Sequence, residues 1–386
     1  MKGESVLLNK VLFAFGGTPK LGGTEAVMMN IFQNIDKSKF KIDFLFYGVK
    51  EDDHSKFTID VKNNGADVFY VPVLREGIIA NHKAIRDILR NNHYDIIHAH
   101  MDASSTDLLR IAKEMGVKVR IAHSHNTAHL QNASSIKDRI HKIYLDFTKM
   151  MLPKYATHFI GCSDAAGLWL FGEKICSQNN YFIFKNAIDV SKYEYNIDIR
   201  NKIRRDYNLQ NFKVICNIGR LSYQKNHPFL LSVFKEVHIR DENTRLILIG
   251  EGEDREKIES LIHELSLDES VIMTGNVLNV NEILQGVDLF FMPSFYEGLS
   301  IAIVEAQASG LKCIASDTVT SQTNISGNVK FLSLEASVDK WAETIISELN
   351  SGEERISPIK RIRDSGFDMI SNIKNLEVFY NNALKL

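Results

Sequence analysis

The chain has 386 residues, of which 44% are hydrophobic and 24% are charged, so it is long enough for two globular domains with separate cores. Its formal net charge of −2 gives no electrostatic reason to expect a nucleic-acid partner. Four cysteines are scattered without metal-binding spacing, and there is neither a signal-peptide pattern nor an apolar run of about 18 residues, so we expect a cytoplasmic protein that does not span a membrane.

The first half of the chain alternates short apolar segments with helical ones. A strand is predicted over 10–15, followed by a glycine-rich loop over 16–24 and a helix over 25–34. The loop matches neither the dinucleotide nor the P-loop fingerprint, and it could be a plain turn or a place where backbone approaches a ligand. Further strands are expected at 42–47, 68–71, 96–99, 117–122, 158–161 and 181–184, with helices at 83–91, 104–115 and 165–171. Such alternation predicts an α/β fold with a parallel, doubly wound sheet.

Histidines cluster at the ends of two predicted strands. His98 and His100 end the first of these strands, and His123 and His125 end the second. The carboxyl ends of parallel strands meet at one edge of a sheet, where imidazoles could bind sugar hydroxyls or form structural hydrogen bonds. A zinc site would need converging ligands, which a sequence cannot show. Structural hydrogen bonding is therefore the favoured interpretation for His98, His100 and His123, and a functional role stays open for His125.

The segment 136–154 is amphipathic and basic. Its five Lys and Arg residues against two Asp residues give it a formal charge of +3, five minus two. Such a helix could lie on anionic lipid head groups, but a helix whose apolar face packs on the core is the favoured interpretation. The apolar positions are Ile136, Ile140, Ile143, Phe147 and Met150.

The second half of the chain opens with a strand over 214–218, a polar loop and a helix from Pro228. The loop places Arg220 and Lys225 at the carboxyl end of a strand and beside a helix N-terminus, an arrangement that suits a diphosphate. Without other signals, cations in a loop are more often solvated. Further strands are expected at 245–249, 271–274 and 287–292, and helices at 338–349 and 370–384.

The stretch from Pro293 to Gly310 is predicted to form a loop and then a helix that Gly310 ends. Glu297 and Glu305 lie eight positions apart, roughly 12 Å of helical rise, which is too far for the carboxylate pair of a glycosidase. We expect them to contact different parts of one elongated ligand, although both could simply be solvated. The loop also carries Gly298, Leu299 and Ser300, whose N–H groups would face a phosphate at the helix N-terminus.

These residues resemble a known family. Glu297 and Glu305 reproduce the E-x7-E pattern of the retaining glycosyltransferases of family four, and the neighbouring P-S-x-x-E-G-L and E-A-x-A-x-G are similar to the same family. Four further stretches resemble family motifs: G-G-T-E from Gly22, S-H-N from Ser124, G-R-L-x-x-x-K-N from Gly219, and N-A-I-D from Asn186 as the junction between domains. In the last two, Asn226 and Ala187 stand in place of glycines that are common in the family.

The resemblance implies the GT-B fold, in which two Rossmann-like domains face each other across a cleft. It implies an acceptor-binding domain over 1–185, a nucleotide-sugar-binding domain over 186–366 and a C-terminal helix over 367–386 that returns to the first domain. The implied reaction is retaining transfer from a nucleoside diphosphate sugar, which we expect to be a UDP-sugar, to a glycan or lipid-linked acceptor. Cell-surface polysaccharide, such as exopolysaccharide or capsule, built at the inner face of the membrane is the expected pathway.

Residue roles also follow from the resemblance. Arg220, Lys225 and the N–H groups after Glu297 would stabilise the leaving diphosphate. Glu305 would bind the ribose, Glu297 the donor sugar, and His125 would position donor or acceptor. The other implied donor-binding residues are Gly22, Gly23, Gly250, Val277, Gly298, Leu299 and Ser300. No metal or other cofactor is expected, since no convincing D-x-D motif is present. An epimerase or phosphorylase of the same fold, or a non-catalytic nucleotide-sugar-binding partner of another transferase, remains an alternative.

Overall fold

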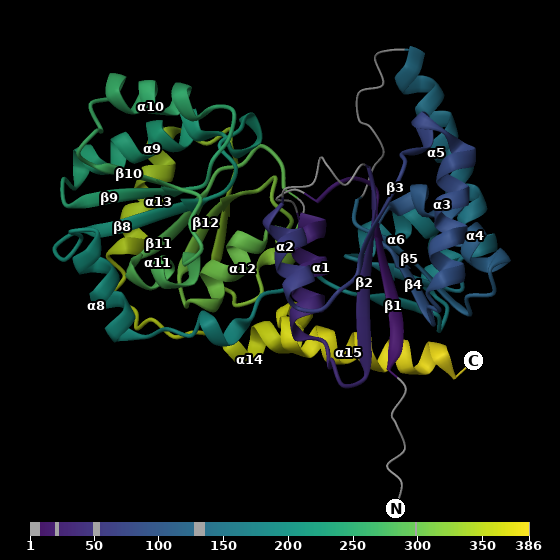
Figure 1. The fold of residues 1–386 in the computed structure, drawn as a ribbon. Helices are drawn as coiled ribbons and strands as arrows, with labels where there is room; N and C mark the ends of the chain where they lie inside the picture. Colours follow the sequence, from purple (N-terminus) through teal and green to yellow (C-terminus); the bar gives the residue numbers. More distant parts are fainter. Residues whose placement is uncertain (1–7, 20–22, 49–54, 127–135, 298, 386) are drawn as a thin grey trace, which may run out of the picture. The chain divides into compact units, whose positions relative to one another are not determined.

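The computed structural model describes residues 8–19, 23–48, 55–126, 136–297 and 299–385 (Figure 1). The chain divides into two compact units. One unit combines the chain up to Asn186 with Ile370–Leu386, and the other spans Ala187–Met369. Within the described residues, no helix has both the length and the apolar character needed to cross a bilayer.

The first unit is built on a seven-stranded sheet with the order β3-β2-β1-β4-β5-β6-β7, in which every pairing is parallel. The order reverses direction between β1 and β4, and such a switch point is where open α/β sheets place their ligands. Its strands are β1 (Asn9–Phe15), β2 (Phe40–Tyr47), β3 (Val68–Val71), β4 (Ile96–Ala99), β5 (Val119–Ser124), β6 (His158–Gly161) and β7 (Tyr181–Ile183). Its helices are α1 (Gly23–Asn34), α2 (Lys56–Asn63), α3 (Ile78–Asn91), α4 (Ser105–Glu114), α5 (Ile136–Tyr155), α6 (Asp164–Phe171), α7 (Glu173–Cys176) and most of α15 (Met369–Leu384).

The second unit has a six-stranded parallel sheet with the order β10-β9-β8-β11-β12-β13, so its switch point lies between β8 and β11. Its strands are β8 (Lys213–Ile218), β9 (Thr244–Ile249), β10 (Val271–Gly275), β11 (Leu289–Met292), β12 (Lys312–Ser316) and β13 (Val329–Leu332). Its helices are α8 (Ile197–Asp206), α9 (His227–Arg240), α10 (Arg255–Glu264), α11 (Val280–Gly286), α12 (Ile301–Ala308), α13 (Val338–Leu349) and α14 (Ile359–Ile362).

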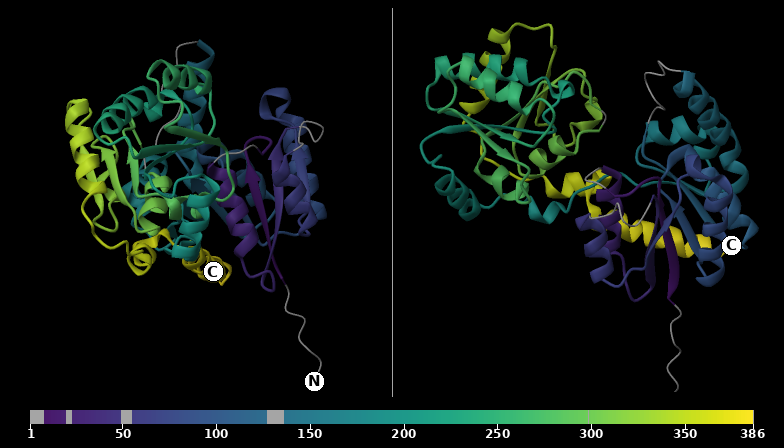
Figure 2. Two further views of the ribbon diagram at one scale, coloured as in Figure 1. Left: turned by 90° about the vertical axis from the view of Figure 1, so that its left-hand side faces the viewer. Right: turned by 45° about the horizontal axis from the view of Figure 1, so that its top comes forward.

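Both faces of the second sheet are covered, because alternate residues of a strand point to opposite sides. Phe290 and Met292 belong to a core that includes α11 and α12, whereas Leu289 and Phe291 belong to a second core that includes α9 and α13. Figure 2 shows helices on both sides of each sheet. The predicted α/β fold with parallel, doubly wound sheets is confirmed.

The C-terminal helix α15 packs against the sheet of the first unit. Tyr380 is fully buried and its hydroxyl lies 2.6 Å from His98 Nδ1. The ring of Phe379 stacks on that of Phe182 with centroids 5.3 Å apart, and the side-chain amide of Asn372 donates to the carbonyl of Lys185. The last residues of the chain therefore belong to the same core as the first strands.

Candidate functional site

An ion pair marks the switch point of the second unit. The loop after β8 ends in a short 3-10 turn at Tyr223–Lys225, and the loop after β11 carries Glu297. Lys225 Nζ lies 2.5 Å from Glu297 Oε1, and these side chains are only 13% and 10% exposed. The structure thus brings together two of the predicted site residues, at the place where a doubly wound sheet receives its ligand.

Main-chain and amide contacts fasten these two loops to each other. The N–H of Phe295 donates to the carbonyl of Gln224, and the side-chain amide of Gln224 donates to the carbonyl of Tyr296, both at 2.9 Å. The amide of Asn226 donates to the carbonyl of Pro293 at 3.1 Å. With both loops anchored, the Lys225 and Glu297 side chains are held in place before any ligand arrives.

Asn226 has left-handed backbone angles, with φ of 55° and ψ of 45°. Glycine adopts this conformation freely, and asparagine tolerates it better than most other residues. The position therefore explains both the glycine that is common in the family motif and its replacement by asparagine here.

Gly250 directly follows β9 and has a φ of +140°, and a Cβ atom there would lie 2.0 Å from the carbonyl oxygen of Gly219. Gly219 is itself covered by the Lys225 side chain, whose Cε atom would lie 2.6 Å from an added Cβ. The loops after β8 and β9 can pack this closely only with glycine at both positions. The predicted donor-binding residue Gly250 thus shapes the surroundings of Lys225.

Arg220 lies apart from this ion pair. Its guanidinium is 73% exposed and pairs with Glu253, which is 57% exposed, at an Nε–Oε2 distance of 3.0 Å. An exposed pair of this kind contributes little to stability, so Glu253 would release the guanidinium to an anionic ligand at small cost.

Glu305 in α12 accepts a hydrogen bond of 2.6 Å from the hydroxyl of Tyr193. Burial raises the pKa of Glu305 to about 7, although the hydrogen bond from Tyr193 offsets part of that rise. Burial and the nearby carboxyl in turn raise the pKa of Tyr193 well above its ordinary value. Tyr193 is a site residue that the sequence did not reveal, because it lies 112 positions from its partner.

The remaining predicted donor residues lie in the second unit, at the start of α1, or outside the described part of the chain. Leu299 and Val277 are partly buried against the hydrophobic core that includes α11 and α12. Ser300 is the N-cap residue, yet its hydroxyl contacts Met292 Sδ and caps no N–H group, so the first turn of α12 lacks a side-chain cap. Gly23 begins α1, whereas Gly22 and Gly298 lie outside the described residues.

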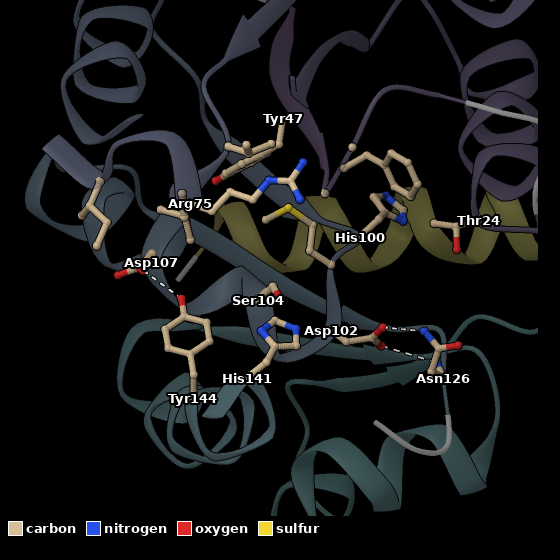
Figure 3. Close-up of a pocket in the computed structure, with 17 residues that line it drawn as sticks. Thr24, Tyr47, Arg75, His100, Asp102, Ser104, Asp107, Asn126, His141 and Tyr144 are labelled. Carbon is tan, nitrogen blue, oxygen red and sulfur yellow. Dashed lines mark hydrogen bonds between the residues drawn. The ribbon is translucent and has the colours of Figure 1, made fainter. Parts of the chain in front are cut away.

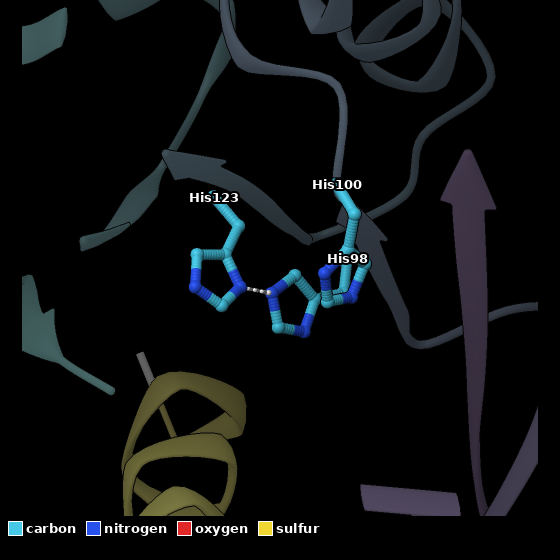
Figure 4. Close-up of side chains that lie close together, drawn as sticks. All are labelled: His98, His100 and His123. Atoms are coloured by element: carbon cyan, nitrogen blue, oxygen red, sulfur yellow. Dashed lines mark hydrogen bonds between the residues drawn. The ribbon is translucent and has the colours of Figure 1, made fainter. Parts of the chain in front are cut away.

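Four histidines form a compact array at the carboxyl ends of β4 and β5 in the first unit. His98 Nε2 lies 3.0 Å from His123 Nδ1, and His100 Nδ1 lies 3.0 Å from His125 Nε2. The two hydrogen-bonded pairs stack on each other, with ring centroids 4.1 Å apart for His98 and His100 and 4.0 Å apart for His123 and His125. Figure 4 shows three of these rings, His98, His100 and His123.

The chemistry of this array favours neutral imidazoles. Burial lowers the pKa of His98, His100 and His123 well below the ordinary value, and lowers that of His125 to about 4. Ring nitrogens of the first three lie within 4.8 Å of one another. However, His98 is nearly parallel to His100 and to His123, at 24° and 18°, and already uses both of its nitrogens. Lone pairs in parallel ring planes do not converge on one ion, so the geometry favours hydrogen bonding over metal ligation.

Asp102 holds the chain that carries His125. Its carboxylate accepts from the N–H of His125 at 2.8 Å and from the side-chain amide of Asn126 at 2.7 Å. Asp102 has a φ of 46°, a left-handed conformation that aspartate adopts more readily than most residues. This carboxylate positions the backbone of His125 while His100 positions its ring.

A cavity of about 840 Å³ opens beside this array, at the switch point between β1 and β4 (Figure 3). Its wall combines aromatic, charged and imidazole side chains, and the hydroxyl of Tyr144 donates to Asp107 at 3.2 Å. Cavities of this size hold small molecules or parts of larger ones. The polar and aromatic lining includes Tyr47, Arg75, His100, Asp107, His141 and Tyr144. Arg75, Tyr47 and Tyr144 carried no sequence signal.

The amphipathic helix α5 presents its apolar face to solvent. Ile143, Phe147 and Met150 are 70%, 56% and 68% exposed, whereas Leu145 and Leu152 are buried in the core. The favoured interpretation, in which the first set packs on the core, is therefore wrong for these described side chains. The helix uses a second set of residues, offset to the opposite side, to pack against the unit.

Comparisons with known proteins place the whole chain among glycosyltransferases. Residues 21–192 match the family model described as Glycosyltransferase Family 4, and residues 199–365 match that of Glycosyl transferases group 1. The chain is 31% identical to the Bacillus subtilis glycosyltransferase EpsF over 96% of each protein. It is 26% identical to the Escherichia coli UDP-Gal:alpha-D-GlcNAc-diphosphoundecaprenol alpha-1,3-galactosyltransferase, over 92% of this chain and 87% of that one. The crystal structure of Anabaena HepE in complex with UDP superposes with a TM-score of 0.77 at 16% identity, covering 97% and 100% of the two chains.

Proposed function

This chain belongs to the family 4 glycosyltransferases and has their GT-B fold, and from this membership we propose that it transfers a sugar from a UDP-sugar to a glycan or lipid-linked acceptor, with retention at the anomeric carbon. The observation that carries the proposal is the buried pair of Lys225 and Glu297 at the switch point of the second unit. UDP as the nucleotide part of the donor is supported by the UDP found with HepE and by the UDP-Gal in the name of the E. coli relative.

The donor would displace an interaction that already exists. A diphosphate beside Lys225 would replace Glu297 as the partner of the ammonium group, and Glu297 would then accept hydrogen bonds from hydroxyls of the donor sugar. Charge grows on the diphosphate as the glycosidic bond breaks, so a preorganised cation and the uncapped N-terminus of α12 would lower the barrier. These residues supply the charge that a metal ion supplies in other transferases, and no cofactor is part of the proposal.

Retention would follow from attack on the face that the diphosphate leaves. The acceptor oxygen bonds to the anomeric carbon while the bond from that carbon to the diphosphate oxygen breaks, and the acceptor proton passes to the departing phosphate. His125 would position the sugar or the acceptor as a neutral imidazole, in keeping with its lowered pKa. Glu305 would bind the ribose hydroxyls and release Tyr193 in doing so.

The cavity of the first unit would receive the acceptor. Its aromatic and polar lining suits a sugar, whose faces pack on rings and whose hydroxyls need hydrogen-bond partners. A lipid-linked acceptor is supported by the names of two relatives, the E. coli enzyme above and a Campylobacter jejuni enzyme that acts on a diphospho-undecaprenol substrate. Surface polysaccharide is supported by a relative named for capsule synthesis in Staphylococcus aureus, 24% identical over 76% of this chain.

The exposed face of α5 would dock on the inner face of the membrane, where such acceptors reside. Three large apolar side chains beside exposed basic residues, among them Lys142, form the combination that interfacial helices use on anionic lipids. The exposed face of α5 would therefore bind an anionic bilayer surface.

A thermal-shift titration with UDP, GDP and ADP in excess EDTA tests the donor site. A ligand at 100 times its dissociation constant adds about 2.7 kcal/mol of stability. We expect UDP to raise the melting temperature without metal in the wild type and to lose most of that effect in Lys225→Ala. The exposed Lys257→Ala serves as the matched control, because Lys257 is 80% exposed and pairs only with Asp254 among ionic partners in the described chain. Stabilisation that is unchanged in Lys225→Ala would remove the support for this site.

A further inference from the structure

Arg75 is an exposed charged residue that lines the cavity of the first unit. Across the described residues it makes neither a hydrogen bond nor an ion pair, and Figure 3 shows its guanidinium extended into the space that the lining residues surround. The two carboxylates of the wall are engaged. Asp107 contacts Arg110 and Tyr144, and Asp102 is bound to the chain at His125. Both carboxylates thus already have donors, whereas the Arg75 guanidinium is available to a ligand.

The N-terminus of α3 adds to this positive charge. Leu74 and Arg75 of the 3-10 turn before α3 line the cavity. Ile78, the first residue of this 14-residue helix, lines it too, so the start of α3 borders the cavity. Its N-cap is Gly77, which has no side chain to accept from the first N–H groups. Free N–H groups and the helix dipole both attract an anion. Glu76 is exposed and does not line the cavity, so its carboxylate does not take the place of a ligand anion there.

A buried imidazole nitrogen of the cavity wall is a second polar group to consider. His100 is 3% exposed and lines the cavity, and its Nδ1 atom is hydrogen-bonded to His125. Its Nε2 atom is buried and has no hydrogen-bond partner among the residues that the structure describes. Leaving a buried polar atom unpaired costs free energy that a ligand oxygen would recover. His100 thus gives a second, independent indication of a polar ligand.

Apolar side chains stand directly beside these groups. Ile78 and Ile79, which open α3, are 58% and 86% exposed. Two large exposed apolar residues next to an unpartnered guanidinium suit an amphiphile, in which an anionic group is joined to a hydrocarbon chain.

We infer that this end of the cavity binds the phosphate of a lipid-linked phosphate acceptor. Arg75 and the first turn of α3 hold the phosphate oxygens, Ile78 and Ile79 contact the start of the hydrocarbon chain, and the sugar lies toward His100. The inference rests on the proposed function, because it names the chemical class of the acceptor for the same reaction.

Binding measurements with geranyl diphosphate, inorganic diphosphate and geraniol test this inference without relying on turnover. Each measurement is made first without UDP and then with saturating UDP, which occupies the donor site. We expect geranyl diphosphate to bind the wild type, inorganic diphosphate to bind more weakly, and geraniol not to bind. Arg75→Gln should raise the dissociation constant for geranyl diphosphate about tenfold or more, as the loss of a charged hydrogen bond predicts. Arg90→Gln is the matched control, because Arg90 lies near the opposite end of α3, is 63% exposed and does not line the cavity.

Three results would overturn the inference. They are equal affinity of wild type and Arg75→Gln for geranyl diphosphate, equal affinity of the wild type for inorganic and geranyl diphosphate, and loss of binding when UDP is added. The first removes the phosphate contact, the second assigns the site to free phosphate, and the third places the ligand in the donor site. Failure of the proposed function would show separately, as absence of stabilisation by UDP.

Discussion

Lys225 Nζ and Glu297 Oε1 lie 2.5 Å apart although 72 positions separate the two residues along the chain. The pair joins the loops at the switch point of the second sheet, and under the proposed function the same contact would serve both the stability of the unit and the binding of the donor. These two contributions can be separated by mutation.

Lys225→Met should destabilise the second unit by roughly 3 kcal/mol, because Glu297 is left as a buried charge without its partner. Transfer activity should fall by about 10² to 10³ in kcat, the usual cost of losing one group that stabilises the charge of a transition state. The double variant Lys225→Met/Glu297→Gln should recover stability but not activity. Chemical denaturation and transferase assays on the three proteins check this, and a double variant that is as active as wild type would contradict it.

Glu305→Gln should change how stability depends on pH. The pKa of Glu305 is raised to about 7, so the folded protein retains a proton that the unfolded chain has lost above its ordinary pKa. The wild type should therefore lose roughly 3 kcal/mol of stability from this group as pH rises from about 4.5 to 7. Glu305→Gln should lack this loss, be more stable than wild type at pH 7.5 and bind UDP more weakly. Equal pH slopes for both proteins in denaturation experiments would exclude the raised pKa.

His125 should act as a neutral group across the physiological pH range. Its pKa is lowered to about 4, so protonation of this ring opposes folding as pH falls from about 6.5 to 4. Roughly 3 kcal/mol of stability should be lost in that window in the wild type and retained in His125→Gln. A proton-detected titration of the imidazole that gives a pKa near 6.5 would contradict the prediction directly.

The triple variant Ile143→Ser/Phe147→Ser/Met150→Ser should lose binding to vesicles that contain phosphatidylglycerol. The variant should stay folded, since these side chains are exposed and removing them leaves no cavity. Ile239→Ser, at a 61% exposed position of α9 in the other unit, is the control for lost apolar surface. Co-sedimentation with vesicles provides the measurement, and equal binding by all three proteins would exclude α5 as the docking face.

Gly250→Ala should be more damaging than a glycine substitution that changes backbone strain alone. The φ of +140° strains any other residue, and the new Cβ would also collide with Gly219. Gly352→Ala is the comparison, because Gly352 has a φ of +67° but nothing within 4 Å of an added Cβ. Strain alone costs about 1–3 kcal/mol, so Gly250→Ala should exceed the loss in Gly352→Ala and should also weaken UDP binding. Matching losses in the two variants would contradict the close packing of these loops.

Strands buried on both faces were predicted well from the sequence. The ranges 96–99 and 158–161 agree with β4 and β6, whose residues are all buried, because buried strands are unbroken apolar runs between polar loops. The range 68–71 also agrees with β3, although only Val71 of that edge strand is buried. β12 and β13 were not predicted. Both are short and contain lysine, and β13 lies at the edge of its sheet with a single buried residue.

The predicted site could be traced only as far as local patterns reach. Lys225 and Glu297 were found because each belongs to a recognisable motif beside a strand end. Tyr193 and Arg75 belong to no motif, and only tertiary packing brings them to Glu305 and to the cavity. In α5 the helical period correctly grouped Ile143, Phe147 and Met150 on one face, but a period does not say which face meets the core.

The hydrogen bond between His98 and Tyr380 has a consequence for how the protein is made. His98 leaves the ribosome long before its partner Tyr380, which lies 282 positions further along the chain. During synthesis the buried ring of His98 therefore lacks this hydrogen bond until α15 is released. A nascent chain stalled before α15 would already contain every strand of both sheets, yet the core of the first unit would still lack Tyr380.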